Sequence, residues 1–275
     1  MRKSLIVALV AIALLAALGI VGWRTYQGMV KRLTPEVCTV TRADGETTSL
    51  SAEQARNASI IVAASIQRGL PERAAVVAIA TAYQESGLRN IDYGDRDSLG
   101  LFQQRPSYGW GTEEEIMDPW YSSNRFYEEL VKFKDWEGTD VNDMAQKVQR
   151  SGFPEAYRKH VPNSEAVAGA LRGSRPASLS CLNFETSPAN PTSFEKVLAA
   201  FGDSLSSEPI DTGLTITTVH ETTAWAAAQH VIANSYDGGA TEVAVGNQVW
   251  RHDEAGWSET SDTPQPTNTV SVTLG

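Results

Sequence analysis

The sequence predicts a mainly α protein with three parts: an N-terminal transmembrane helix, an all-α domain and a small C-terminal α+β module. Three observations lead to this fold class. An uncharged apolar run covers residues 4–23, apolar residues recur at helical spacing over residues 51–173, and strand-like segments are concentrated after residue 194. We expect an anchor at 1–27, a stalk at 28–50, an all-α domain at 51–185, a linker at 186–193 and the α+β module at 194–275.

The apolar run SLIVALVAIALLAALGIVGW extends from Ser4 to Trp23 without a charge. A helix needs roughly 20 such residues to cross a bilayer core, and Trp23 and Tyr26 lie where an interfacial aromatic belt would be. One alternative is a cleaved signal peptide, whose apolar core usually has roughly 7–15 residues, and another is a buried helix of a cytosolic protein. We therefore expect a single-pass protein of the cell membrane whose main domains are extracytoplasmic, or a protein secreted after signal cleavage.

Charge excludes one class of partner. The formal net charge is −10, and removing the five basic residues that precede Glu36 leaves −15 for the rest of the chain. Nucleic acids require a basic face, so we expect no nucleic-acid partner. A carbohydrate would have to be bound by hydrogen bonds and aromatic stacking.

The chain has only two cysteines, Cys38 and Cys181. In an oxidising compartment they would form one disulfide; the alternative is two unrelated buried thiols. The sequence contains no CxxC pattern, and its four histidines lack the spacing of metal ligands. We expect neither a metal nor a cofactor.

The all-α domain opens with a clear helix start. Ser51 and Gln54 are placed as a capping box, and the helix should continue to about Arg68 and stop at Gly69. Its stripe of apolar residues has helical spacing.

The second helix should be central to the domain. It starts near Pro71, is apolar on nearly every side from Ala74 to Ala82, and is therefore predicted to be buried. Glu85 lies in its last turn, and Gly87 suits the left-handed position that ends a helix.

Further helices are predicted after Asp118, around 142–151, and at 154–160 and 164–171. Between the helices, Gly87–Thr112 is the only long irregular segment, and such a length usually signals function. After the linker, we expect helices at 194–205 and 222–234 and strands at 212–220, 242–245, 248–251 and 268–274.

Glu85 has the features of a general acid. A carboxyl at the end of a buried helix loses water, which raises its pKa, and the negative end of the helix dipole acts in the same direction. A carboxyl that stays protonated near neutral pH can protonate a glycosidic oxygen.

The residues around Glu85 resemble a known signature. Glu85-Ser86, an apolar residue at Leu88, and the tetrad Gly100-Leu101-Phe102-Gln103 are similar to the motif of lytic transglycosylases and goose-type lysozymes. The longer runs GDRDSLGLFQQRPSYGWGT and VQRSGFPEAY resemble exported lysozyme-like proteins of actinobacteria and their phages. The resemblance covers about residues 51–173 and implies a lysozyme-like fold.

The resemblance implies a reaction on the glycan strands of peptidoglycan. Glu85 would be the catalytic acid/base, Ser86 would support its orientation, and Gly100 would allow a close approach of the chain. In lytic transglycosylases one glutamate protonates the leaving oxygen and then deprotonates the muramoyl 6-hydroxyl, which closes a 1,6-anhydro ring. A two-carboxylate hydrolase would need a second acid, and the nearby acids Asp92, Asp95 and Asp97 are all open candidates.

Substrate contacts are expected from polar and aromatic residues near the motif: Ser86, Ser98, Gln103, Gln104, Tyr108, Trp110, Gln149 and Tyr157. The chain departs from the family at two places. Asp97-Ser98 replaces the usual Gly-Ala, and Val148-Gln149 stands where a Tyr-Asn pair is common. These departures favour the main alternative, a non-catalytic peptidoglycan-binding or scaffold protein with a lysozyme-like fold.

The C-terminal module faintly resembles zinc D,D-carboxypeptidase-like domains. Its last strand reads Asn268-Thr269-Val270-Ser271 where that family has metal-binding residues. The resemblance therefore implies a module that has lost zinc binding and peptidase activity and that has a binding or structural role.

Overall fold

The computed structural model describes residues 2–151, 153, 155–260 and 264–275, without the side chains of 2–11, 13, 27 and 30–32. Two compact units are present, Met1–Glu36 and Val37–Gly275. The second unit includes both the predicted all-α domain and the predicted C-terminal module.

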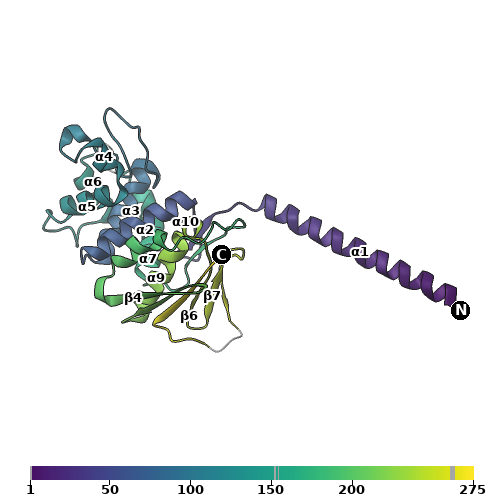
Figure 1. Cartoon of the computed structure of the whole chain (residues 1–275). Helices are drawn as coiled ribbons and strands as arrows, with labels where there is room; N and C mark the ends of the chain where they lie inside the picture. The colour runs from purple at the N-terminus through teal and green to yellow at the C-terminus, as the bar shows by residue number, and fades with distance from the viewer. Residues whose placement is uncertain (1, 152, 154, 261–263) are drawn as a thin grey trace. The chain divides into compact units, whose positions relative to one another are not determined.

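In the described chain, most helices lie between β2 and β3, and most strands follow β3 (Figure 1). In chain order the elements are α1 (Arg2–Leu33), β1 (Cys38–Thr41), β2 (Thr47–Leu50), α2 (Ala52–Gln67), α3 (Glu72–Ser86), η1 (Pro106–Tyr108), α4 (Glu113–Met117), α5 (Pro119–Leu130), α6 (Val141–Gln149), η2 (Arg158–His160), α7 (Val161–Arg172), β3 (Leu179–Cys181), α8 (Thr192–Ala199), η3 (Gly202–Ser204), β4 (Leu205–Ile210), β5 (Gly213–Thr218), α9 (Glu221–Ala233), α10 (Ser235–Gly238), β6 (Ala240–Val245), β7 (Gln248–Arg251), β8 (Trp257–Glu259) and β9 (Thr269–Leu274).

The predicted fold class is wrong in its proportions. The protein is mixed α/β, with 47% helix, 17% strand and two sheets of three and six strands. The first sheet was not predicted, because its strands have only three or four residues each and one of them is far away in the sequence. The predicted start of a helix at Pro154 lies outside the described residues.

The predicted transmembrane helix is a second correction. Within the described residues, no helix is both long and apolar enough to cross a membrane.

The first sheet brings the two cysteines together. Its strand order is β2-β1-β3, and both pairs are antiparallel. Cys38 and Cys181 are direct partners in the β1–β3 register and form a disulfide across 143 residues, which confirms that prediction.

The helices pack around α3. Its residues from Ala74 to Ala82 are buried, and α2, α5, α6 and α7 contact it. The capping box of α2 is present: the Gln54 N–H donates to Ser51 Oγ at 3.2 Å, and the Ser51 N–H donates to Gln54 Oε1 at 2.8 Å. Gly87 ends α3 with a φ of 64°, as predicted.

The second sheet is antiparallel throughout, with strand order β4-β5-β9-β6-β7-β8. In Figure 1 this sheet lies below the helices, and α9 contacts its strands β5, β6 and β9. Buried Ala, Val and Ile side chains of α9 and the inward side chains of the strands therefore form one continuous core.

Buried polar groups of α9 join the C-terminal module to the helices. The fully buried Gln229 accepts hydrogen bonds from the N–H groups of Ser178 and Leu179 and donates to the carbonyl of Ala170 at 2.8 Å. Gly173, at the end of α7, approaches the α9 backbone so closely that a Cβ would clash with the carbonyl of Thr222. Each buried hydrogen bond lost here would leave a costly unpaired group.

The disulfide should be a major contributor to stability. Replacing both cysteines (Cys38→Ser with Cys181→Ser) should lower the free energy of unfolding by about 4–5 kcal/mol, because the cross-link closes a very long loop in the unfolded chain. Urea denaturation followed by circular dichroism measures this change. Reduced wild-type protein is the matched control and should show the same loss. A change of less than about 1 kcal/mol would contradict the prediction.

Candidate active site

Glu85 lies where the buried helix α3 reaches the surface. It is in the last turn of α3, and its side chain is partly buried. Burial raises the pKa of its carboxyl above the ordinary value, while hydrogen bonds from Tyr157 and Gln149 act against this rise. Burial therefore favours the protonated form of Glu85, whereas Tyr157 and Gln149 stabilise its carboxylate form through hydrogen bonds.

Tyr157 fixes the orientation of the Glu85 carboxyl. Its hydroxyl donates to Glu85 Oε1 at 2.6 Å. Burial, followed by the charge of Glu85, raises the pKa of Tyr157 above its ordinary value, so the hydroxyl remains a donor. The Tyr157 ring is fully buried, which leaves the hydroxyl little freedom to move.

Gln149 occupies the position next to Glu85 at the end of α6. Besides its contact with Glu85, its amide donates to the carbonyl of Phe102 at 2.7 Å. Phe102 belongs to the predicted Gly100–Gln103 tetrad. Gln149 thus connects the acid to the loop that carries the rest of the motif.

Ser86 holds the same loop from the other side. Its hydroxyl is buried and donates to the carbonyl of Leu101 at 2.8 Å. This contact agrees with a supporting role, but it leaves the hydroxyl turned to the loop backbone. The structure does not place Ser86 among the residues that line the cleft.

The tetrad is a tight turn. Leu99 and Gln104 pair as an isolated bridge, and the four residues between them reverse the chain. Gly100 has a φ of 74°, and a Cβ there would lie 2.8 Å from the carbonyl oxygen of Ile116. Only glycine allows both the conformation and the approach without strain.

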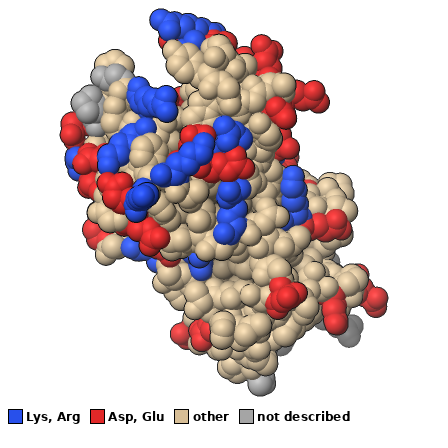
Figure 2. Space-filling view, turned by 90° about the vertical axis from the view of Figure 1, so that its left-hand side faces the viewer, with Lys and Arg blue, Asp and Glu red and all other residues tan. Residues whose placement is uncertain are grey.

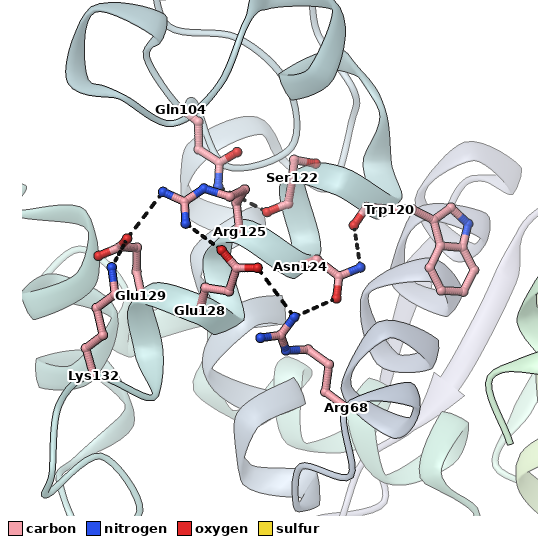
Figure 3. A network of polar contacts seen from close by, with 9 residues as sticks. All are labelled: Arg68, Gln104, Trp120, Ser122, Asn124, Arg125, Glu128, Glu129 and Lys132. Atoms are coloured by element: carbon pink, nitrogen blue, oxygen red, sulfur yellow. Dashed lines mark hydrogen bonds and ion pairs between the residues drawn. The ribbon is translucent and has the colours of Figure 1, made fainter. Parts of the chain in front are cut away.

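The two glutamines after Phe102 point in different directions. Gln103 lines the cleft, and its amide makes long contacts with the carbonyls of Tyr93 and Gly100, at 3.3 and 3.4 Å. Gln104 is 2% exposed and donates to the carbonyl of Ser122 at 3.1 Å, in the core beside α5 (Figure 3). The Gln104 side chain therefore does not reach the cleft, and the expected contact between Gln104 and substrate is not possible in this structure.

An open cleft of about 530 Å³ lies in front of Glu85. Of the sequence-predicted residues it brings together Glu85, Ser98, Gln103, Tyr108, Trp110 and Gln149; it is also lined by Asp95, Arg105, Gly109, Arg125, Glu129, Val148, Arg150 and Ser151. Tyr157 lies behind Glu85 rather than on the cleft wall.

Asp97 braces the cleft loop instead of obstructing it. Its carboxylate accepts the backbone N–H of Ser107 at 2.9 Å and forms an ion pair with Arg105 at 2.7 Å. Hydrogen bonds from Ser107 and then from Arg105 hold the pKa of Asp97 well below its usual range. Ser98 is nearly buried in the cleft wall. Asp97 and Ser98, where the chain differs from the lytic transglycosylase motif, therefore leave the cleft open.

Two arginines under the aromatic residues were missed as site residues. The Arg105 guanidinium lies 4.3 Å from the centre of the Tyr108 ring, and that of Arg125 lies 5.7 Å from the centre of the Trp110 ring. The position of Arg105, two residues after the tetrad, was one available signal. Arg125 is distant in the sequence, so no local pattern could reveal it.

Ion pairs hold Arg125 in place. Figure 3 shows Arg125 with Glu128, at 2.6 Å, and Glu129, at 3.3 Å, on the same helix. Lys132 contacts Glu129, and Arg68, the C-cap residue of α2, reaches Glu128 at 3.7 Å. This network immobilises one wall of the cleft.

Among the residues that the structure describes, no group of three His, Cys, Asp or Glu side chains could hold a metal ion. Two histidines of the C-terminal part have other contacts: His252 Nδ1 lies 2.6 Å from the carbonyl of Asn183, and His230 Nδ1 lies 2.7 Å from Ser59 Oγ.

Comparison with known proteins adds no family to these observations. Neither the protein-family models nor the curated proteins contain a match to the chain.

Because the pKa of Glu85 is raised, the free energy of unfolding should depend on pH through this carboxyl. The folded carboxyl binds its proton more tightly than the unfolded one, so ionisation above the unfolded pKa destabilises the fold. Glu85→Gln should therefore be more stable than wild type at pH 7, and the difference should vanish near pH 3.5, below the ordinary glutamate pKa of about 4.3. Urea unfolding at both pH values measures it.

Glu129→Gln is the matched control, with the opposite sign. Burial raises the pKa of Glu129, but hydrogen bonds and charges of Lys132 and Arg125 bring it below the ordinary value. This variant should be less stable than wild type at pH 7 and similar to it at low pH. If Glu85→Gln destabilised the protein at pH 7 as Glu129→Gln does, the assignment of a raised pKa would be wrong.

Proposed function

We propose that the protein cleaves glycan strands of peptidoglycan with Glu85 as its single acid/base, as a lytic transglycosylase does. The observation that carries the proposal is the Glu85 carboxyl itself. It is partly buried at the end of a buried helix, held by Tyr157 at 2.6 Å, and faces an open cleft lined by amides and aromatic rings.

The chemistry requires one group that first gives and then takes a proton. The protonated Glu85 donates to the glycosidic oxygen as the C–O bond breaks. The resulting carboxylate, which Tyr157 and Gln149 stabilise, takes the proton of the 6-hydroxyl of the same sugar. That oxygen attacks the sugar C1, closes the 1,6-anhydro ring and restores the protonated acid.

The other acids of the cleft support a single-carboxylate reaction. Glu129 is committed to Arg125 and Lys132, and Asp97 to Arg105 and Ser107. Asp95 also lines the cleft, but its side chain is 90% exposed and its nearest cation, Arg96, is 4.0 Å away. A hydrolase base needs a carboxylate that is both well positioned and free to take a proton from water. Glu129 and Asp97 are engaged in ion pairs, and Asp95 is not held in position.

The walls of the cleft suit a sugar. Tyr108 is 66% exposed and has Arg105 against one face of its ring, so the other face is available for stacking. Gln103 and Gln149 line the same cleft as Glu85 and carry amide groups. Recognition by stacking and neutral hydrogen bonds is compatible with the acidic chain.

An extracytoplasmic location follows from the same proposal. Disulfides persist in oxidising compartments, and the buried Cys38–Cys181 bond is a permanent part of the first sheet. The glycan strands of the wall are in such a compartment.

The decisive test is product analysis. The full chain is incubated with purified peptidoglycan, and the released fragments are identified by mass spectrometry. We expect 1,6-anhydro products, a loss of about 10³-fold in rate for Glu85→Gln, and near wild-type rates for Asp95→Asn. Reducing-end products that depend on Asp95 would show hydrolysis. Retained glycan binding with no cleavage would leave a binding protein and refute the catalytic proposal.

The Tyr157→Phe variant tests whether Tyr157 affects both the position and the pKa of the Glu85 carboxyl. Removing the hydroxyl leaves the Glu85 carboxylate with Gln149 as its remaining side-chain donor, so the pKa of Glu85 should rise further. Because the reaction needs the protonated acid, the fall in activity at high pH should shift to a higher pH, and kcat should drop about tenfold. An unchanged pH profile would show that Tyr157 does not act on Glu85.

A further inference from the structure

A second hollow lies far along the chain from Glu85, in the C-terminal part. It has a volume of about 650 Å³ and runs between α8 and the edge strand β4. Its floor is apolar, formed by Phe194, Leu198, Leu205, Pro209, Leu214 and Leu274. We refer to it as the α8–β4 groove.

The groove exists because the core-facing side of the sheet is not fully covered. In the β4–β5 register, Ser207 and Pro209 lie opposite Ile216 and Leu214, and directly opposed residues share one face of a sheet. Ile216 and Leu214 are buried, whereas Ser207 and Pro209 are exposed. The core-facing side of the sheet therefore extends to Ser207 and Pro209, where no helix covers it.

The strand beside the groove also has an open edge. Among the described residues, β4 is an edge strand of the sheet and pairs only with β5. Ile210 and Gly213 close a two-residue turn, and such a closing pair exchanges hydrogen bonds. Hydrogen-bonded and non-hydrogen-bonded pairs alternate along β4, so the N–H and C=O groups of Ser207 point away from β5, toward the open edge. Pro209 occupies another position of this kind. Proline has no N–H, and it is usual at such positions of edge strands.

The charge around the groove has one sign. Residues 194–275 contain two basic residues, Lys196 and Arg251, against eleven Asp and Glu, which gives −9 of the net charge of −10. Glu195, Glu208 and Asp211 line the groove, and within the described residues none of them is in an ion pair. In Figure 2, the lower part of the molecule, at the level of β4 in Figure 1, shows Asp and Glu and no Lys or Arg.

We propose that the α8–β4 groove binds an extended, Lys- or Arg-bearing segment of a partner protein. The segment adds to the edge of β4 through Ser207, places an apolar side chain against Phe194 and Leu198, and brings its cations to Glu195 and Asp211. The acidic field favours association with cations and opposes nucleic acids and anionic lipid surfaces. This binding site does not depend on the chemistry at Glu85.

A peptide selection tests the proposal directly. A displayed library of random ten-residue peptides is selected on the immobilised full chain, and enriched peptides are synthesised and measured by fluorescence anisotropy. We expect enrichment of sequences that alternate apolar residues with Lys or Arg. Their binding should weaken at least tenfold when every Lys and Arg is replaced by Glu.

Variants of the chain decide where and how the peptides bind. Ser207→Pro removes the outward N–H without breaking a bond of the β4–β5 ladder, so the melting curve should be unchanged and binding should fall at least tenfold. Glu195→Lys with Asp211→Lys should cause a similar fall. The matched control, Asp253→Lys with Glu259→Lys, makes the same change of charge outside the groove and should alter binding less than threefold.

Three results would overturn the proposal. The first is a selection that enriches no basic peptide. The second is binding that Ser207→Pro leaves unchanged, since the edge of β4 would then play no part. The third is an equal loss in both pairs of charge variants, which would indicate attraction to the net charge alone.

Discussion

The burial of the middle of α3 is the constraint on which the rest of the structure depends. Its alanine-rich middle, Ala74–Ala82, is surrounded by other helices, and small side chains allow them to approach closely. A helix of this kind must still satisfy its last carbonyl groups, so it has to end where the chain can turn. Gly87 provides that turn at the surface. Glu85 is consequently fixed at the boundary between core and solvent, and that position raises its pKa.

The parts of the fold that could be predicted are those with short-range causes. The capping box at Ser51, the left-handed Gly87 and the end of α7 at Gly173 are local rules, and the structure contains all three. The first sheet could not be predicted in the same way. β1, β2 and β3 are too short to show a period, and the pairing of Cys38 with Cys181 depends on the whole domain between them.

The residues of the candidate site also differ in whether local sequence could predict them. Glu85, Gln103 and Gln149 could be selected from motif and spacing, and they do line one cleft. Gln104 could not be distinguished from Gln103, because a tight turn with positive φ at Gln103 sends adjacent side chains to opposite sides. Arg125 is placed by the packing of α5, a relation between distant segments that a single sequence does not express.

The contacts of β3 have a consequence for the order of assembly during synthesis. The N–H of Leu179 needs the side chain of Gln229, and its carbonyl accepts from the indole of Trp257 at 2.9 Å. The carbonyl of Cys181 likewise accepts from Trp250. A nascent chain that has reached Cys181 therefore possesses both thiols but lacks the groups that fix the strand carrying the second one. The hydrogen bonds of β3 with Gln229, Trp250 and Trp257 can therefore form only after the last third of the chain has emerged.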